Sequence, residues 1–268
     1  MSDHPLATRW RALRAASQPG FIAYLTAGHP SAARTIDALR MLDAEGVDII
    51  ELGIPFSDPL ADGPIIQASS HAALTGGASV AGVLAMLREA AVRTPVVAFS
   101  YLNPILAYGP ERFVTDAARA GVSGLLLTDL PAGADPDLEA RLGRGPLALI
   151  RLVAPTTSPA RLAAMTFDPR GFVYVIARLG VTGAATTVDA ELRAVLGRVR
   201  GVTDLPLAVG FGIREPAQAQ ALAADADGVV VGSALVERLG EGLESARALV
   251  RALRQALVAA PAVAPEGA

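Results

Sequence analysis

The sequence predicts a single (β/α)₈ barrel, an α/β fold, with one extra helix before the first strand. Its length of 268 residues suits one such barrel. Eight short apolar runs, rich in Val, Ile and Leu and without polar alternation, are typical of parallel strands buried on both faces. Amphipathic stretches alternate with these runs, which favours a closed barrel over an open sheet. The expected strands are residues 21–26, 48–54, 95–100, 124–128, 147–152, 171–176, 207–210 and 228–231.

Helical patterns occupy several of the intervals between these strands. Ser31, Ser79 and Asp189 stand where N-cap residues are preferred, directly before three of the patterns. The expected helices are residues 31–45, 79–93, 110–120, 189–200 and 215–223.

The two ends of the chain lie outside this repeat. Residues 5–16 are expected to form the extra helix, which would cap the bottom of the barrel. The tail at residues 259–268 is of low complexity and is predicted to be disordered. Since no linker interrupts the repeat, residues 1–258 are predicted to form one domain.

Composition excludes several kinds of chemistry. All 23 basic residues are Arg, so a lysine Schiff base, covalently held pyridoxal phosphate and a Walker A loop are excluded. Cysteine is absent, which excludes disulfides, thiolate zinc sites and a cysteine nucleophile. The three histidines, His4, His29 and His71, lack metal-ligand spacing, so we expect no metal site.

Charge and hydropathy limit the partners and the compartment. The net charge is −3 and no basic patch is present, which argues against nucleic acid as a partner. No apolar run reaches the ~18 residues of a membrane span, so we expect no membrane association. No signal-peptide pattern begins the chain, which predicts a cytoplasmic location.

Three carboxylates mark the end of the second expected strand. Glu51 interrupts an apolar run, where an ionised carboxylate is costly unless it is paired or used. The following loop supplies Asp58 and Asp62 and is stiffened by three prolines. A strand-end acid followed by a rigid acidic loop is typical of active sites in (β/α) barrels.

Glycine-rich turns follow the sixth, seventh and eighth expected strands, at residues 180–184, 210–213 and 232–234. All three would lie on the C-terminal face of the barrel, where glycine lets the backbone approach an anion and present its N–H groups. Ser233 would add a hydroxyl donor. Any one of these turns alone could serve only a tight strand-to-helix connection, but three together predict a phosphate site.

These motifs together resemble the tryptophan synthase alpha chain family, from about residue 21 to residue 236. The most specific part is the run ELGIPFSDPLADGPIIQ at residues 51–67. Supporting pieces are TAGHP at 26–30, YLNP at 101–104, TDLP at 128–131, GVTG at 180–183, GFG at 210–212 and GS at 232–233.

The resemblance implies a retro-aldol cleavage of indole-3-glycerol phosphate to indole and glyceraldehyde 3-phosphate, without metal or organic cofactor. It also implies a pyridoxal-phosphate-dependent beta chain as partner, in an alpha2–beta2 tetramer. Two alternatives stay open: a free-standing lyase with the same site, and a non-catalytic subunit that binds a phosphate ligand and regulates its partner.

Roles in catalysis follow from the resemblance. Glu51 would protonate carbon 3 of the indole ring and then act as base toward the glycerol hydroxyl. Asp62 would accept a hydrogen bond from the indole N–H, and Tyr174 would orient Glu51 or contact the substrate. Structural alternatives are an ion pair of Glu51 with an Arg, an N-cap role for Asp62 and a core position for Tyr174.

Binding residues are expected around these three. Tyr24, Phe99 and Phe211, with Phe21 as a further candidate, could wall an indole pocket, although apolar strand residues are core by default. Pro55 and Asp58 would lie on the partner-facing loop. The substrate and its phosphate are expected to contact Thr182, Gly183, Phe211, Gly212, Gly232 and Ser233.

The loop at residues 180–187 resembles a lid that closes over the substrate. Ala177 and Leu179 stand just before it, where the family more often has hydroxyl residues, and this difference would alter how the lid closes. After Pro131 the sequence Ala-Gly-Ala-Asp replaces an acidic pair that is usual in the family. That segment is expected on the rim, where it would affect partner affinity.

Overall fold

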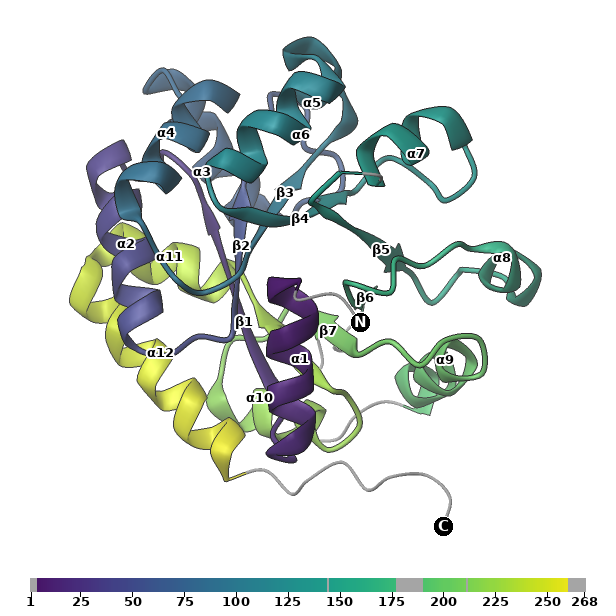
Figure 1. Cartoon of the computed structure of the whole chain (residues 1–268). Helices are drawn as coiled ribbons and strands as arrows, with labels where there is room; N and C mark the ends of the chain where they lie inside the picture. The colour runs from purple at the N-terminus through teal and green to yellow at the C-terminus, as the bar shows by residue number, and fades with distance from the viewer. Residues whose placement is uncertain (1–3, 144, 177–189, 211, 260–268) are drawn as a thin grey trace.

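The computed structural model describes residues 4–143, 145–176, 190–210 and 212–259. Eight parallel strands form one closed barrel in sequence order (Figure 1). The strands are β1 Gly20–Thr26, β2 Ile49–Gly53, β3 Val96–Ser100, β4 Val122–Leu127, β5 Ala148–Val153, β6 Val173–Ile176, β7 Leu207–Gly210 and β8 Gly228–Val231. The barrel and all eight expected strands are therefore confirmed, with ends that differ by up to two residues.

Helices surround the barrel, and one further helix, α1, precedes the first strand. The described helices are α1 Pro5–Ala15, α2 Ala32–Ala44, α3 Pro64–Thr75, α4 Val80–Ala90, α5 Leu102–Tyr108, α6 Pro110–Arg119, α7 Pro136–Gly143, α8 Pro159–Ala164, α9 Ala190–Arg200, α10 Pro216–Ala223, α11 Ser233–Glu241 and α12 Leu243–Val258. Ser31 and Ser79 cap α2 and α4, each accepting the backbone N–H three residues ahead at 3.2 Å. The expected cap Asp189 lies outside the described residues.

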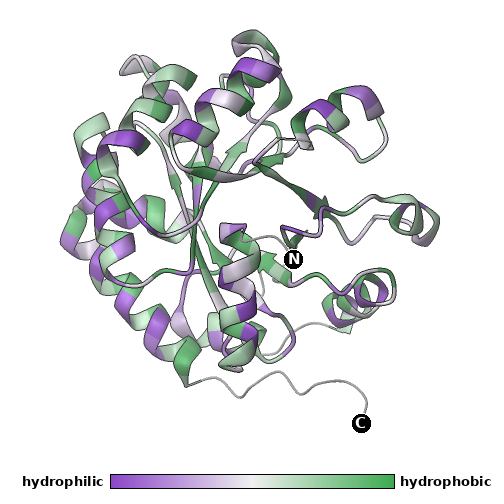
Figure 2. Cartoon of the chain, in the orientation of Figure 1, coloured by the Kyte–Doolittle hydropathy of each residue, from purple (hydrophilic) through white to green (hydrophobic). Residues whose placement is uncertain are grey.

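The barrel interior and the layer between strands and helices form two separate apolar clusters. Alternate residues of each strand point to one or the other, so Ile22 lies inside while Phe21 and Ala23 pack against the helices. Figure 2 shows hydrophobic strands inside a ring of helices that carry both hydrophilic and hydrophobic segments. This division decides which strand residues can reach the mouth of the barrel.

The extra helix α1 closes the N-terminal end of the barrel, as the sequence predicts (Figure 1). Its Trp10 packs against Phe172 inside the barrel, with ring centroids 5.6 Å apart. The indole fills the space beside Gly20 and Gly228, where an added Cβ would lie 2.9 and 2.7 Å from it. This packing fills the N-terminal end of the barrel interior.

The described helices give no single span that is long and apolar enough to cross a membrane. Only α3 and α4 taken together pass that test, and they meet at a bend of 95°.

Candidate active site

Glu51 points into the barrel near the C-terminal end of β2. Its side chain is 1% exposed, and neither carboxylate oxygen has a hydrogen-bond partner among the described residues. Burial raises the pKa of the Glu51 carboxyl to about 8, because a desolvated site disfavours the charged form. This burial favours the protonated form of Glu51 at neutral pH. The structural ion pair with an Arg is not found within the described part of the chain.

Asp62 lies in the loop between β2 and α3, on the same side of the barrel as Glu51. The Tyr101 hydroxyl donates to Asp62 Oδ2 at 3.0 Å and accepts the backbone N–H of Ala61 at 2.9 Å. Burial raises the pKa of Asp62 to about 6, and the Tyr101 hydrogen bond opposes that rise. Gly63, not Asp62, is the N-cap of α3, so the expected alternative of a capping role is wrong. Burial thus raises the pKa of both carboxyls, and that of Glu51 further than that of Asp62.

Two tyrosines lean across glycines of the neighbouring strands. An added Cβ on Gly53 would lie 2.2 Å from the Tyr24 hydroxyl, and one on Gly210 would lie 2.1 Å from the Tyr174 hydroxyl. Burial first, and then the charges of Glu51 and Asp62, raise the pKa of the Tyr174 phenol. Both tyrosines are buried, and glycine on the next strand is what admits each phenol.

Aromatic rings line part of this end of the barrel. Tyr24 and Phe99 meet edge to face with centroids 5.3 Å apart. Phe99 packs against the inner cluster, and Tyr24 lies two residues beyond the inward-facing Ile22 on β1. Phe21 is different, because it lies in the outer cluster against the helices and is 1% exposed. Phe21 is therefore a core residue and not a wall of the barrel mouth.

The turn after β8 places the start of α11 beside Tyr24. Gly232 is the N-cap of α11 without a side-chain cap, and Ser233 is its first residue. An added Cβ on Gly232 would lie 3.4 Å from the Tyr24 ring. Gly212, after β7, has φ of +77°, a conformation that favours glycine. These turns share the C-terminal face with Glu51.

Other expected binding residues lie outside the described residues. Thr182 and Gly183, with the neighbouring Ala177 and Leu179, belong to the range 177–189, and Phe211 is likewise excluded. Their predicted roles stay predictions.

The loop expected to face a partner is partly buried and partly exposed. Pro55 is buried, whereas Asp58 is exposed and accepts a hydrogen bond from the Ser57 hydroxyl at 2.5 Å. Leu60 in the same loop is 91% exposed. The segment after Pro131 is also largely exposed, as expected of a rim, and Asp135 accepts the backbone N–H of Leu138 in α7 at 2.9 Å.

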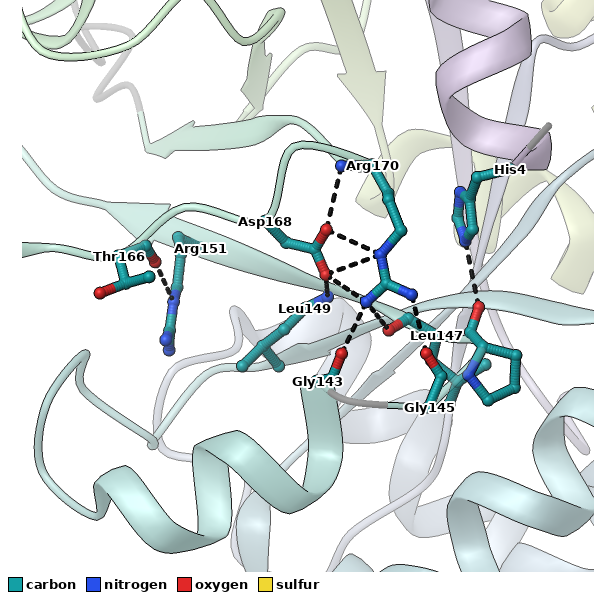
Figure 3. A network of polar contacts seen from close by, with 10 residues as sticks. His4, Gly143, Gly145, Leu147, Leu149, Arg151, Thr166, Asp168 and Arg170 are labelled. Atoms are coloured by element: carbon teal, nitrogen blue, oxygen red, sulfur yellow. Dashed lines mark hydrogen bonds and ion pairs between the residues drawn. The ribbon is translucent and has the colours of Figure 1, made fainter. Parts of the chain in front are cut away.

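A second polar cluster lies away from this face. Arg170 pairs with Asp168 at 2.6 Å and donates to the carbonyl oxygens of Gly143, Gly145 and Leu147 before β5 (Figure 3). A hollow of about 550 Å³ opens beside it, between α7 and α8. Because the cluster ties together segments at the N-terminal ends of strands, it serves stability and not chemistry. Among the described residues no group of three or more His, Asp or Glu could hold a metal ion.

The sequence does not predict a role for three polar residues of the site. Tyr101 holds Asp62, and the buried hydroxyls of Thr26 and Ser69 lie 2.7 Å apart beside Tyr24. Tyr101 and Thr26 stand at or directly after the ends of β3 and β1, and this placement is the signal that could have identified them. Ser69 lies inside α3, where no such signal exists.

Comparison with known proteins decides the family. The family model described as tryptophan synthase alpha chain matches residues 10–262. The chain belongs to the tryptophan synthase alpha chain family. An alpha chain from Synechocystis is 48% identical over 241 residues, which cover 88% of this chain and 91% of that protein. One from Gluconacetobacter diazotrophicus is 46% identical and covers 90% and 89%.

Solved structures agree with the tryptophan synthase alpha chain assignment. Tryptophan synthase from M. tuberculosis in its aminoacrylate-bound form matches with a TM-score of 0.85 and 38% identity, over 94% of this chain and 99% of that one. The alpha subunit from Legionella pneumophila matches with a TM-score of 0.87 and 33% identity, over 96% and 99%. The chain is therefore an alpha subunit in tryptophan biosynthesis, a carbon–carbon lyase that cleaves indole-3-glycerol phosphate.

Proposed function

We propose that cleavage of indole-3-glycerol phosphate in this chain proceeds by acid–base catalysis with Glu51 and Asp62, without metal or organic cofactor. The observation that carries the proposal is that burial raises the pKa of both carboxyls but to different values, about 8 for Glu51 and about 6 for Asp62. Paired titratable groups whose environments separate their pKa values are typical of acid–base sites.

Protonated Glu51 donates its proton to carbon 3 of the indole ring. Ionised Asp62 accepts a hydrogen bond from the ring N–H and stabilises the positive charge that develops there. The resulting Glu51 carboxylate removes the proton of the hydroxyl on the carbon bonded to the ring. That carbon becomes the aldehyde of glyceraldehyde 3-phosphate as the carbon–carbon bond breaks, and neutral indole leaves. Tyr174 orients Glu51 or the substrate.

Binding of the phosphate is assigned to Gly212, Gly232 and Ser233, with Thr182, Gly183 and Phe211 as further contacts. The uncapped N-terminal turn of α11 supports this assignment, since its free N–H groups favour an anion. Tyr24, Phe99 and Phe211 wall the indole. The edge-to-face contact of Tyr24 and Phe99 supports their place in that wall.

A pyridoxal-phosphate-dependent beta chain is the proposed partner, in an alpha2–beta2 tetramer in the cytoplasm. The loop that carries Pro55, Asp58 and the exposed Leu60 would contact it, because this loop also holds Asp62 and so links partner and site. Indole is apolar and crosses membranes readily, which makes direct transfer between subunits advantageous. A free-standing lyase with the same site is the alternative.

The test is indole release from indole-3-glycerol phosphate by the wild type, Glu51→Gln and the exposed control Glu89→Gln, each with and without a cognate beta chain. We expect turnover that rises with the beta chain, is lost in Glu51→Gln by ~10²-fold or more, and is kept in the control. Fast turnover without the beta chain would favour the free-standing lyase. Full activity of Glu51→Gln would refute the acid role, and no turnover in any mixture would favour the non-catalytic alternative.

A further inference from the structure

The side-chain amide of Gln67 bridges the two ends of the turn that carries Asp62. Its Nε2 donates to the backbone carbonyl of Asp62 at 2.9 Å and to that of Pro59 at 3.4 Å. The backbone N–H of Asp62 also donates to the Pro59 carbonyl, at 3.0 Å, which closes a turn at residues 59–62. Gln67 is the last residue of the motif at residues 51–67, and this contact links it to the site.

The partners of this amide decide its orientation. Both are carbonyl oxygens, which only accept hydrogen bonds, so Nε2 and not Oε1 must face them. Gln67 is the fourth residue of α3, and its backbone N–H donates to the carbonyl of Gly63 at 3.0 Å. Helix α3 is itself fixed on β1 through Ser69, whose hydroxyl lies 2.7 Å from that of Thr26. The amide therefore reaches the turn from a fixed helix.

Packing contributes little to the position of this turn. Leu60 is 91% exposed and Ala61 is exposed as well, so hydrogen bonds must fix the backbone. Tyr101 makes two of them, because its hydroxyl donates to the Asp62 carboxylate at 3.0 Å and accepts the N–H of Ala61 at 2.9 Å. Both end on one atom, the phenol oxygen, about which the turn could pivot. The Gln67 amide is a second fixed point, on a different element.

We propose that Gln67 is a positioning residue, which fixes the turn at residues 59–62 and so keeps the Asp62 carboxylate directed at the ring N–H of the substrate. The inference rests on the proposed role of Asp62. The placement of a group that contacts the reacting molecule matters steeply, since a displacement of ~1 Å can cost on the order of 10²-fold in rate. Loss of the Gln67 donor is therefore expected to weaken the Asp62 contact and to leave the rest of the site intact.

Gln67→Met keeps the length of the side chain and removes its donor. The decisive comparison uses two competitive inhibitors of indole release, a 3-alkylindole phosphate and its benzofuran counterpart, in which an oxygen replaces the ring N–H. Because Asp62 can accept a hydrogen bond only from the N–H, the indole compound should bind about tenfold more weakly to Gln67→Met. The benzofuran compound should bind within about twofold of its wild-type affinity. A merely structural role of Gln67 would weaken both inhibitors alike.

The titration of Asp62 gives a readout that needs no activity. Burial is the largest cause of its raised pKa, and the hydrogen bond from Tyr101 opposes that rise. When the turn is free to move, the carboxylate reaches water, so its midpoint in Gln67→Met should fall from about 6 toward 3.8, by about half a pH unit. Tyr101→Phe should raise the midpoint instead, because Gln67 still fixes the turn and only the hydrogen bond is lost. NMR on protein labelled with ¹³C at aspartate carboxyls measures the midpoint, with the signal assigned by its loss in Asp62→Asn.

Gln255→Met, at an exposed glutamine of α12, is the matched control and should leave both affinities and the midpoint at their wild-type values. Gln67→Glu keeps the shape of the side chain but not its donor, and should lose affinity for the indole inhibitor as Gln67→Met does. An unmoved midpoint in Gln67→Met, with Asp62→Asn inactive, would overturn the inference and leave the proposed function in place. A lowered midpoint without selective loss of the indole inhibitor would support the role of Gln67 and refute the contact of Asp62 with the ring N–H.

Discussion

Tyr24 and Glu51 are register partners on β1 and β2, yet the phenol hydroxyl lies over Gly53, two residues beyond the carboxylate, and bonds to Thr26. The same arrangement recurs across the barrel, where Tyr174 lies over Gly210. A glycine on the neighbouring strand thus leaves space for each phenol, which does not contact Glu51. Glu51 is buried and has no hydrogen-bond partner in the part of the chain that the structure describes, and burial raises its pKa to about 8.

The activity of the lyase should depend on pH in two limbs. The proposed mechanism uses ionised Asp62 and protonated Glu51, so kcat should fall below about pH 6 and above about pH 8. Tyr101→Phe removes the hydrogen bond that favours ionised Asp62, and the acid limb should then move up by about half a pH unit. Indole release between pH 5 and 9.5 measures both limbs. Tyr108→Phe, which affects a bond to Asp116, is the control, and an acid limb at its wild-type position in Tyr101→Phe would contradict the assignment.

The free energy of unfolding should depend on pH through the ionisation of Glu51. Its pKa is about 8 in the folded chain against 4.5 for the unperturbed group, so its contribution is complete below about pH 4.5 and is lost as the pH rises to about 8. Glu51→Gln does not ionise, and its free energy of unfolding relative to wild type should therefore rise across this range by about 5 kcal/mol. Urea unfolding at pH 4.5, 6, 7.5 and 9 tests this. A difference that stays constant with pH would show that Glu51 has the same pKa in the folded and the unfolded chain.

The Arg170 cluster should matter for stability alone. Arg170→Met removes the ion pair with Asp168 and the hydrogen bonds to three carbonyl oxygens, and should lower the free energy of unfolding by about 2 kcal/mol. Urea unfolding measures the loss. Arg112→Met, whose side chain is 70% exposed beside Asp116, should change stability by less than about 0.5 kcal/mol. Equal effects of the two substitutions would refute a special role for the cluster.

The exposed Leu60 should contribute to binding of the beta chain. Leu60→Asp places a charge in the proposed contact, so about tenfold more beta chain should be needed for half-maximal stimulation of indole release. Val202→Asp, at an exposed valine that follows α9, is the matched control. If both variants respond to the beta chain like the wild type, the Leu60 loop is not part of the interface.

Much of the architecture is encoded locally. Uninterrupted apolar runs predict strands buried on both faces, and the barrel has all eight. The N-caps Ser31 and Ser79 follow from the hydrogen bonds that short side chains make within one turn. Glu51 could be predicted as functional because a carboxyl is costly inside an apolar run wherever that run is buried.

The sequence by itself therefore determined the barrel, its capping helix, the family and the two carboxylates, since these follow from periodicity, composition and motifs along the chain. Only the tertiary structure decided the hydrogen-bond partners and the burial of the carboxylates. Tyr101 meets Asp62 across 39 residues of sequence, and Ser69 meets Thr26 across 43. Hydrogen-bond partners and desolvation depend on distances through space, which local patterns do not encode. For the same reason only the fold could show that Phe21 faces the helices while Tyr24 faces the site.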